Sequence, residues 1–311
     1  MSDAKVRVAV IGVGHLGQHH ARIYSEMPGV ELVAVVDTAE ARRREVGGRL
    51  KVQAQADYRP LLGAVDAVSV AVPTYLHHEI ARAFLLAGTD VLVEKPMTRT
   101  VGEADDLLRA ASGRVLQVGH SERYNAAVQA LADLVVAPGF IEVHRMGPFP
   151  GRGTDVDVVL DLMIHDLDII LTLVKSPVTG VTAVGVPVVS GRVDIANARL
   201  EFASGCVANI TASRVTGERL RKIRVFQRDT YFVLDYASQE LHLFKPTPVE
   251  GSGGRSQLIR VDIPVTRSEP LRQELADFVE SVRTRRPPLV PGEAGREAVH
   301  VAAQIVERLS G

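Results

Sequence analysis

The chain has 311 residues, of which 46% are hydrophobic and 23% are charged, an ordinary globular composition. At roughly 100–200 residues per domain, this length predicts two domains. The formal net charge is −1, which gives no general attraction to nucleic acid or to an anionic membrane surface. The apolar runs fall short of the ~20 residues that span a bilayer, and the N-terminus lacks the pattern of a signal peptide. Cys206 is the only cysteine, so no internal disulfide can form, and we expect a soluble protein of the reducing cytoplasm.

The first 120 residues alternate short valine-rich runs with helical patterns. The runs expected to be strands are Val6–Ile11, Leu32–Val36, Val65–Val72, Val91–Val93 and Val115–Val118. They are mostly continuous in hydrophobicity, which is typical of parallel strands that helices cover on both faces. The alternating order predicts a Rossmann domain, a doubly wound parallel sheet with right-handed crossovers, over residues 1–121.

The pattern changes after about residue 122. Residues 157–174 predict a mostly apolar helix, and residues 181–244 read as successive strands. Ala203-Ser204-Gly205 and Arg228-Asp229 are expected to be hairpin turns. Residues 122–311 therefore predict an α/β domain with an open, mainly antiparallel sheet, whose C-terminal helices are free to pack back on the first domain.

Few helices are predicted to cover this second sheet. Its expected apolar positions include Val207, Ile210, Phe232 and Leu234. Uncovered apolar patches above a few hundred Å² are rare in monomers, so we expect one face to be buried in a homodimer or homotetramer.

A glycine motif follows the first predicted strand and opens the first helix. The segment from Gly12 to Gly17 reads G-x-G-x-x-G, in which the glycines allow a tight turn, close approach of a pyrophosphate and close helix packing. Asp37 ends the second strand about twenty residues later, where a carboxylate accepts hydrogen bonds from ribose hydroxyls. The alternative is a glycine-rich turn in a domain without a cofactor, but strand, spacing and acid all favour a dinucleotide site. Its expected residues are Gly12, Gly14, His15, Leu16, Gly17 and Asp37.

The choice between NAD and NADP depends on two features. Asp37 would repel a 2′-phosphate and so favours NAD. Arg42-Arg43-Arg44 follows shortly after and is interpreted first as a solvated helix face. A phosphate clamp is the other interpretation, so NADP stays open.

Residues after the third and fourth strands are placed at the cofactor wall, because ligands of such sheets bind beyond the carboxyl ends of the strands. These residues are Pro73, Thr74, His77, Glu94 and Lys95. The neighbouring histidines 77 and 78 point in different directions on a helix and lack further ligands, so we predict capping or packing and no metal site. A charged Glu-Lys pair after a buried strand is either a salt bridge or a lysine held beside the nicotinamide.

Asp161, His165 and Asp168 have the spacing of one helix face in apolar surroundings. One interpretation is a core histidine paired with a carboxylate. The other is a general acid or base that a carboxylate orients. Both remain open from the residues alone.

The motifs VAVIGVGHLG, VPTYLHHEIA, VLVEKPM, VGHSERYN and LDLMIHDLD occur in the order typical of the Gfo/Idh/MocA oxidoreductases. The chain resembles this family over essentially its whole length, although Met163 stands where the family often has glycine. The resemblance implies a Rossmann domain followed by an open sheet that mediates oligomerisation. It also implies that Lys95 lies beside the nicotinamide and substrate, with His165 as acid/base and Asp161 as its partner or a substrate ligand. The expected substrate-binding residues are His120, Arg123, Tyr124, Asn125 and Asp168.

We therefore expect an NAD(P)-dependent enzyme that moves hydride between nicotinamide and a hydroxyl-bearing carbon of a sugar, polyol or nucleotide sugar. The segments GHSERYN and DVDVVLDLMIHDLD are similar to a subgroup associated with lipid A biosynthesis. Some members of that subgroup oxidise the 3-hydroxyl of UDP-N-acetylglucosamine, which is the leading expectation. The alternatives are a glycosidase that uses NAD+ transiently and a non-catalytic dinucleotide-sensing regulator, which would not need Lys95, Asp161 and His165.

Overall fold

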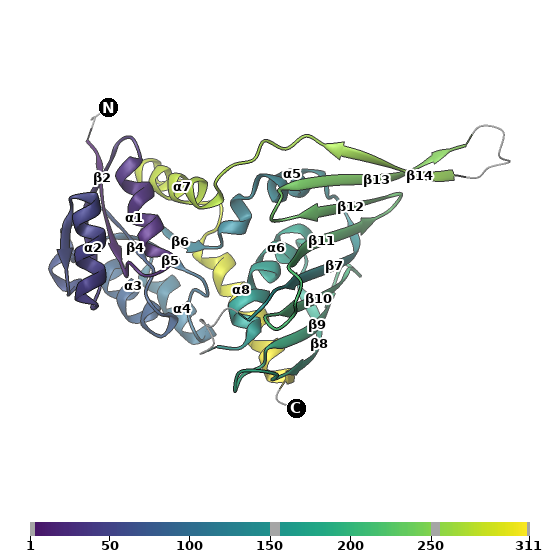
Figure 1. Ribbon diagram of the computed structural model, residues 1–311, viewed down its shortest axis with the longest axis horizontal. Coiled ribbons are helices and arrows are strands. Elements are labelled where there is room, and N and C mark those ends of the chain that lie inside the picture. Colours follow the sequence, from purple (N-terminus) through teal and green to yellow (C-terminus); the bar gives the residue numbers. More distant parts are fainter. Residues whose placement is uncertain (1–3, 150–155, 250–255, 310–311) are drawn as a thin grey trace. The chain divides into compact units, whose positions relative to one another are not determined.

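The computed structural model describes residues 4–149, 156–249 and 256–309. The chain divides into two compact units (Figure 1). The first comprises Met1–Ser121 and Glu269–Val299, and the second comprises Glu122–Ser268 and His300–Gly311.

The first unit is built on a six-stranded sheet with the order β3-β2-β1-β4-β5-β6. Its strands are β1 (Val6–Ile11), β2 (Val30–Val36), β3 (Gln53–Gln55), β4 (Ala67–Val70), β5 (Asp90–Glu94) and β6 (Leu116–Gly119). All neighbouring strands are parallel. The predicted doubly wound Rossmann sheet is confirmed, and its strand order reverses between β1 and β4, where such sheets bind ligands.

Helices of the first unit pack on this sheet. They are α1 (Gly17–Glu26), α2 (Glu40–Leu50), α3 (His77–Leu86), α4 (Val101–Ala110), α7 (Pro270–Thr284) and the first part of α8 (Gly292–Leu309). Short 3₁₀ turns lie at η1 (Arg59–Leu61), η2 (Thr74–Leu76) and η3 (Ser121–Tyr124). Helix α7 lies beside α1 although it comes late in the sequence (Figure 1). Its Leu275 and Phe278 are fully buried in one core with Val8 and Val10 of β1.

The second unit is built on an eight-stranded sheet with the order β14-β13-β12-β11-β7-β10-β9-β8. Its strands are β7 (Pro138–Met146), β8 (Val178–Val186), β9 (Ile195–Phe202), β10 (Val207–Ser213), β11 (Leu220–Gln227), β12 (Thr230–Asp235), β13 (Glu240–Pro248) and β14 (Ser256–Ile263). The strands pair antiparallel except β7 and β10, which are parallel. The mainly antiparallel sheet and both hairpins are thus confirmed, and Gly205 and Asp229 occupy the positive-φ turn positions at +84° and +61°.

One face of this sheet is covered by α5 (Ala126–Leu134) and α6 (Ile164–Val174), which lie against it in Figure 1. Strand β9 shows the consequence, because Ala198 and Leu200 are buried while the alternating Asn197 and Arg199 are exposed.

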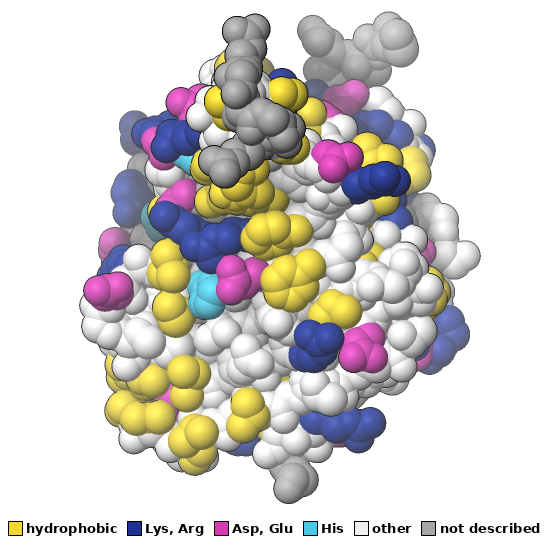
Figure 2. All heavy atoms as spheres, turned by 90° about the vertical axis from the view of Figure 1, so that its right-hand side faces the viewer, with side chains coloured by type: hydrophobic (Ala, Val, Ile, Leu, Met, Phe, Trp, Pro, Cys, Tyr) yellow, Lys and Arg dark blue, Asp and Glu magenta, His cyan; other side chains and the backbone are white. Residues whose placement is uncertain are grey.

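The other face carries a row of half-buried aromatic side chains across four strands. Phe140, Phe226, Tyr231 and Phe244 are direct cross-strand neighbours, with successive ring centroids 5.8, 5.1 and 4.5 Å apart. Figure 2 faces the side on which this sheet lies and shows hydrophobic side chains in several groups among charged ones.

The four apolar positions named for this sheet are divided between its two faces. Ile210, Phe232 and Leu234 are 0%, 3% and 0% exposed and pack under the helices, whereas Val207 is half-buried. Side chains alternate between the two faces along these strands, and the sequence alone does not tell which face the helices cover. Among the residues that the structure describes, no helix is long and apolar enough to cross a membrane.

Candidate cofactor and catalytic site

The glycine loop between β1 and α1 has the shape that a dinucleotide requires. Gly12 has φ +85°, and a Cβ there would lie 2.7 Å from the carbonyl oxygen of Ala71. A Cβ on Gly17 would lie 1.8 Å from the carbonyl oxygen of Gly12, so both positions require glycine. A Cβ on Gly14 would meet only the guanidinium of Arg42, at 3.4 Å. The middle glycine therefore leaves open space beside the helix N-terminus, where a pyrophosphate binds in such folds.

Asp37 at the end of β2 is fixed beside this loop. Its Oδ2 accepts a hydrogen bond from the backbone N–H of Val13 at 3.1 Å, and its Oδ1 accepts one from Ala39 at 2.9 Å. A carboxylate has about four acceptor positions, so capacity for ribose hydroxyls remains. Leu16, 40% exposed, and the exposed His15 belong to the same loop.

The three consecutive arginines of α2 occupy different environments. Arg44 is 75% exposed and pairs with Glu40 at 2.7 Å, as a solvated helix face predicts. Arg43 donates to the carbonyl oxygen of Thr38 at 3.1 Å. The guanidinium of Arg42 is the one that reaches the neighbourhood of Gly14.

His77 ties together two strand ends of the first unit. Its Nε2 lies 2.8 Å from the carbonyl oxygen of Val72, after β4, and its Nδ1 lies 2.9 Å from that of Pro96, after β5. The side chain is 1% exposed, so it fixes the segment containing Pro73 and Thr74 through the backbone. The neighbouring His78 pairs with Asp106 at 2.9 Å instead.

Glu94 is the last residue of β5 and Lys95 follows it, and the Lys95–Pro96 peptide is cis. The Glu94 carboxylate is buried. Its Oε1 lies 3.0 Å from His20 Nε2, and its Oε2 accepts a hydrogen bond from the Lys95 backbone N–H at 3.2 Å.

 Both carboxylate oxygens are therefore engaged. Burial would raise the pKa of Glu94, but the hydrogen bond from His20 and the charge of Lys95 outweigh it and hold that pKa below its ordinary value. No site role is predicted for His20 from the sequence. The feature that could have indicated one is a histidine among the apolar, buried positions of α1.

The acid–histidine segment of the second unit differs from the single α-helix that its spacing predicts. Val159–Met163 forms a π-helical turn, η4, and α6 begins at Ile164. Asp161 therefore lies in the π-helical turn, which is wider than an α-helical turn, and His165 lies in the first turn of α6. His165 and Asp161 are half-buried.

Asp168 and Arg123 are brought together on the second unit. Asp168 is 2% exposed, and its Oδ1 accepts a hydrogen bond from Arg123 Nη1 at 3.2 Å. Arg123 also donates to the hydroxyl of Thr172, one turn further along α6. Two expected substrate residues thus form one ion pair on the helix that also carries His165.

The other residues of the GHSERYN segment are mostly buried. His120, Tyr124 and Asn125 are 1%, 3% and 1% exposed. Asn125 caps α5 by accepting from the backbone N–H of Ala127 at 3.1 Å, and it donates to the carbonyl oxygen of Tyr236 at 3.0 Å. These contacts shape the segment that presents Arg123.

Arg214, after β10, organises the segment around Asp161 and was missed in the sequence. It is 1% exposed, and its Nε donates to Asp194 Oδ1 at 2.9 Å while its Nη1 lies 3.8 Å from Asp161 Oδ2. Asp194 also accepts three backbone N–H groups, from residues 188–190. Burial opposes ionisation, but the Ser190 hydroxyl and these N–H groups outweigh it and hold the pKa of Asp194 well below its ordinary value.

A second buried ion pair lies next to His165 in sequence. Asp166 is 0% exposed and accepts two hydrogen bonds from Arg145, at 2.7 and 2.9 Å. Arg145 also pairs with Glu122 at 3.1 Å. Such bidentate pairs fix side-chain geometry, so Asp166 anchors α6 and leaves its neighbour His165 on the more exposed side.

Comparison with known proteins identifies the family. Residues 6–120 match the model described as "Oxidoreductase family, NAD-binding Rossmann fold", and residues 148–230 match the GFO/IDH/MocA C-terminal domain. A UDP-N-acetylglucosamine 3-dehydrogenase from Acidithiobacillus ferrooxidans is 37% identical over 306 residues, which cover 96% of each chain. The chain belongs to the Gfo/Idh/MocA oxidoreductases.

Further relatives agree with this family. A solved structure of the Acidithiobacillus ferrooxidans UDP-N-acetylglucosamine 3-dehydrogenase has a TM-score of 0.92 at 36% identity, covering 98% of this chain and 97% of that one. The scyllo-inositol 2-dehydrogenase (NAD(+)) of Bacillus subtilis is 27% identical over 93% of this chain and 89% of its own. The protein is thus an oxidoreductase with an NAD-binding Rossmann domain, and the predicted family, enzyme class and cofactor are confirmed.

Proposed function

We propose that this oxidoreductase oxidises the 3-hydroxyl of UDP-N-acetylglucosamine, with NAD+ as the hydride acceptor. The observation that carries the proposal is the 37% identity over 96% of both chains with a UDP-N-acetylglucosamine 3-dehydrogenase. The inositol dehydrogenase aligns over nearly the same length at only 27% identity. A nucleotide sugar is therefore favoured over a free polyol.

The residues of the first unit would hold the cofactor. Gly12, Gly14 and Gly17 receive the pyrophosphate, and Asp37 accepts hydrogen bonds from the adenosine ribose. His15, Leu16, Pro73 and Thr74 line the remaining wall, while His77 and Glu94 fix that wall through the backbone. When bound, NAD+ supplies a two-electron acceptor that takes a hydride from the carbon bearing the hydroxyl.

Three residues carry the rest of the chemistry. His165 removes the hydroxyl proton as the C–H bond breaks and the C=O bond forms, so the alcohol loses one proton and one hydride in total. The Lys95 ammonium stabilises the negative charge that develops on the oxygen. Asp161 orients His165, and its proximity to Arg214 supports a fixed position for this carboxylate.

We assign the substrate-facing residues to the segment around the Arg123–Asp168 pair. The planar, permanently charged guanidinium of Arg123 suits the oxygen-rich groups of a nucleotide sugar. His120, Tyr124 and Asn125 are buried and would act by shaping this segment.

We further propose that a second copy of the chain covers the aromatic face of the eight-stranded sheet, giving a homodimer or homotetramer. The support is the row of four half-buried rings on a face that α5 and α6 do not cover. A cytoplasmic location is proposed from cysteine use, since the single cysteine, Cys206, is buried in the second unit.

The experiment is a substrate panel followed by NADH absorbance. UDP-N-acetylglucosamine, UDP-glucose, N-acetylglucosamine, myo-inositol and scyllo-inositol are each mixed with enzyme and NAD+. We expect NADH with UDP-N-acetylglucosamine and a product with a ketone at C3. NADH with an inositol alone would overturn the substrate, sugar release without net NADH would indicate the redox glycosidase, and binding without turnover of any compound would indicate the regulator.

A further inference from the structure

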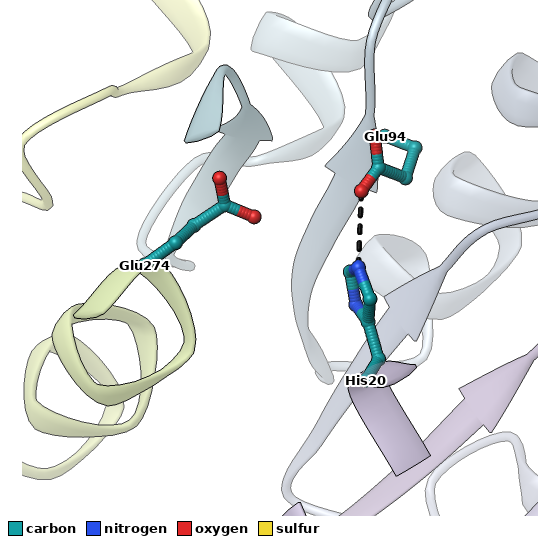
Figure 3. A group of neighbouring side chains, drawn as sticks. All are labelled: His20, Glu94 and Glu274. Carbon is teal, nitrogen blue, oxygen red and sulfur yellow. Dashed lines mark hydrogen bonds and ion pairs between the residues drawn. The ribbon is translucent and has the colours of Figure 1, made fainter. Parts of the chain in front are cut away.

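Three chemistry-bearing side chains from distant parts of the sequence meet in the core of the first unit (Figure 3). His20 comes from α1, Glu94 from the end of β5 and Glu274 from α7, and all three are buried. One nitrogen or oxygen atom from each lies within 4.8 Å of the others. Glu94 and His20 form a hydrogen bond, whereas the Glu274 carboxyl group points toward this pair without one.

Glu274 has the environment of a neutral acid. Its side chain is 0% exposed, and neither carboxyl oxygen has a hydrogen-bond partner. The nearby amide of Gln117 donates to the backbone carbonyl of Glu274 at 3.0 Å and so does not serve the carboxyl group. An ionised carboxylate without partners in such a place is strongly unfavourable.

The neighbouring groups reinforce this conclusion. Glu94 faces Glu274 from β5, His20 and Tyr24 face it from α1, Gln117 faces it from β6, and Asp277 lies on the same helix. Burial first, and then the charges of Glu94 and Asp277, raise the pKa of Glu274 well above its ordinary value. Two carboxyl groups this close do not both ionise in a dry core. Glu94 has the His20 and Lys95 donors that stabilise a charge, so the proton belongs on Glu274.

Glu94 links this cluster to Lys95. Its second oxygen accepts the backbone N–H of Lys95 at 3.2 Å. The backbone of Gly119 closes the other side, since a Cβ there would lie 3.0 Å from the Glu94 carboxyl group. A change in the charge or position of Glu94 would therefore be transmitted to the Lys95 backbone.

We propose that Glu274 is held as a neutral carboxylic acid and acts as a positioning residue, which lets the charged Glu94 and its partner His20 fix the backbone of Lys95. This inference rests on the proposed role of Lys95 in the reaction. Ionisation of Glu274 would place a second negative charge against Glu94 and disturb the Lys95 backbone.

Infrared difference spectroscopy tests the protonation without any substrate. The spectrum of wild type minus Glu274→Gln at pH 7 should contain the carbonyl band of a protonated carboxylic acid. A carboxylate band there instead would overturn the proposal. So would a stoichiometric metal ion, found by elemental analysis of the purified wild type and lost in Glu274→Gln, because three such ligands could also hold a cation.

Stability against pH gives a second test that is independent of activity. A carboxyl group whose pKa is raised on folding favours the folded state below the unfolded pKa of about 4.3, and this advantage is lost as the pH rises above that value. The unfolding constant of the wild type, relative to that of Glu274→Gln, should therefore rise with pH by up to about tenfold per unit. Glu280→Gln, at an exposed position of the same helix, is the matched control and should show no such trend. A flat ratio for Glu274→Gln would contradict the proposal.

Turnover tests the link to Lys95, with whichever panel compound forms NADH. Glu274→Gln should retain wild-type kcat at pH 7 and should keep it at alkaline pH values where the wild type declines, with little change in KM. Identical alkaline profiles for the two proteins would overturn the positioning role. If no panel compound reacts, the proposed function fails while the infrared and stability measurements still decide the state of Glu274.

Discussion

His77 Nδ1 lies 2.9 Å from the carbonyl oxygen of Pro96, which joins the start of α3 to the segment that carries Lys95. The other ring nitrogen lies 2.8 Å from the carbonyl oxygen of Val72. Two carbonyl acceptors favour an imidazolium ring, but burial is the larger effect and lowers the pKa of His77 below its ordinary value. The ring is therefore neutral at pH 7 and donates to one carbonyl at a time.

Replacing His77 should reveal this contact. His77→Leu leaves a buried carbonyl group without a donor, which typically costs about 1–3 kcal/mol of unfolding free energy. Because the folded pKa is lowered, the wild type should lose stability as the pH falls below the unfolded value of about 6.5, and the variant should lack that loss. Chemical denaturation from pH 5 to 8 measures both effects. His78→Leu is the control, since His78 is more exposed and should change stability little.

Cofactor preference should follow Asp37. We expect NAD+ to bind at least about tenfold more tightly than NADP+, equal to about 1.4 kcal/mol, because the carboxylate repels a 2′-phosphate. Asp37→Ala should narrow this gap, and Glu40→Ala, which removes a carboxylate paired with Arg44 at the helix surface, should not. Titration by fluorescence gives both dissociation constants. Stronger NADP+ binding by the wild type would show that Arg42 or Arg43 acts as a phosphate clamp.

Replacing Arg214 should lower the free energy of unfolding more than replacing an exposed arginine of the second unit. Arg214→Met leaves Asp194 buried without its cationic partner, and breaking a buried pair in this way typically costs about 3–5 kcal/mol. Arg199→Met removes a 45% exposed partner of Glu201 and should cost less than about 1 kcal/mol. Urea denaturation compares the two. Equal effects would mean that the Arg214–Asp194 pair contributes no more than a surface pair.

Assembly should depend on the aromatic row. Light scattering at micromolar concentration should give the mass of a dimer or tetramer for the wild type, and Tyr231→Lys should shift it toward the monomer because it places a charge among stacked rings. Val136→Lys, at an 86% exposed position, should leave the mass unchanged. A monomeric wild type would reject the proposed assembly.

The parts of the fold that follow from local sequence could be predicted. Every residue of β4, β5 and β6 is buried, which accounts for the mostly apolar runs that predict these strands. The glycine loop could also be predicted from the sequence, because the backbone atoms close to Gly12 and Gly17 leave no room for a Cβ atom. Strand β3 was not predicted, because it is a three-residue, partly exposed edge strand of sequence QAQ without an apolar run.

Features that depend on contacts between residues far apart in the sequence could not be predicted from local sequence patterns. Strand β7 pairs parallel with β10, which follows it only after α6 and two further strands. The His20–Glu94–Glu274 cluster needs α1, β5 and α7 in place before its residues are neighbours. Arg214 looks like an ordinary cation after a strand until the fold buries it against Asp194. The π turn at Asp161 likewise has no pattern that distinguishes it from a continuing α-helix.

The reaction itself should fail when either proposed catalytic side chain is removed. His165→Ala loses the base and Lys95→Ala loses the group that stabilises the oxygen, and each change should lower turnover by about 10²–10⁴-fold. Cofactor affinity should change little, because both groups act on the substrate hydroxyl. The double variant should lose less than the product of the two single losses, since residues that act as a unit are not additive. Single-turnover NADH formation measures all three.

Thermal melting of the same samples separates this mechanism from a structural role of His165. A core histidine would, on removal, lower the melting temperature and leave the turnover of each folded molecule intact. The half-buried position of His165 on α6 predicts the opposite, a nearly unchanged melting temperature with lost turnover. Asp161→Asn should lower turnover less than His165→Ala, because it keeps the side-chain shape near Arg214 while removing the charge that we propose orients the histidine. Retained turnover in folded His165→Ala would remove His165 from the mechanism and leave Lys95 or His120 as the proton-transferring group.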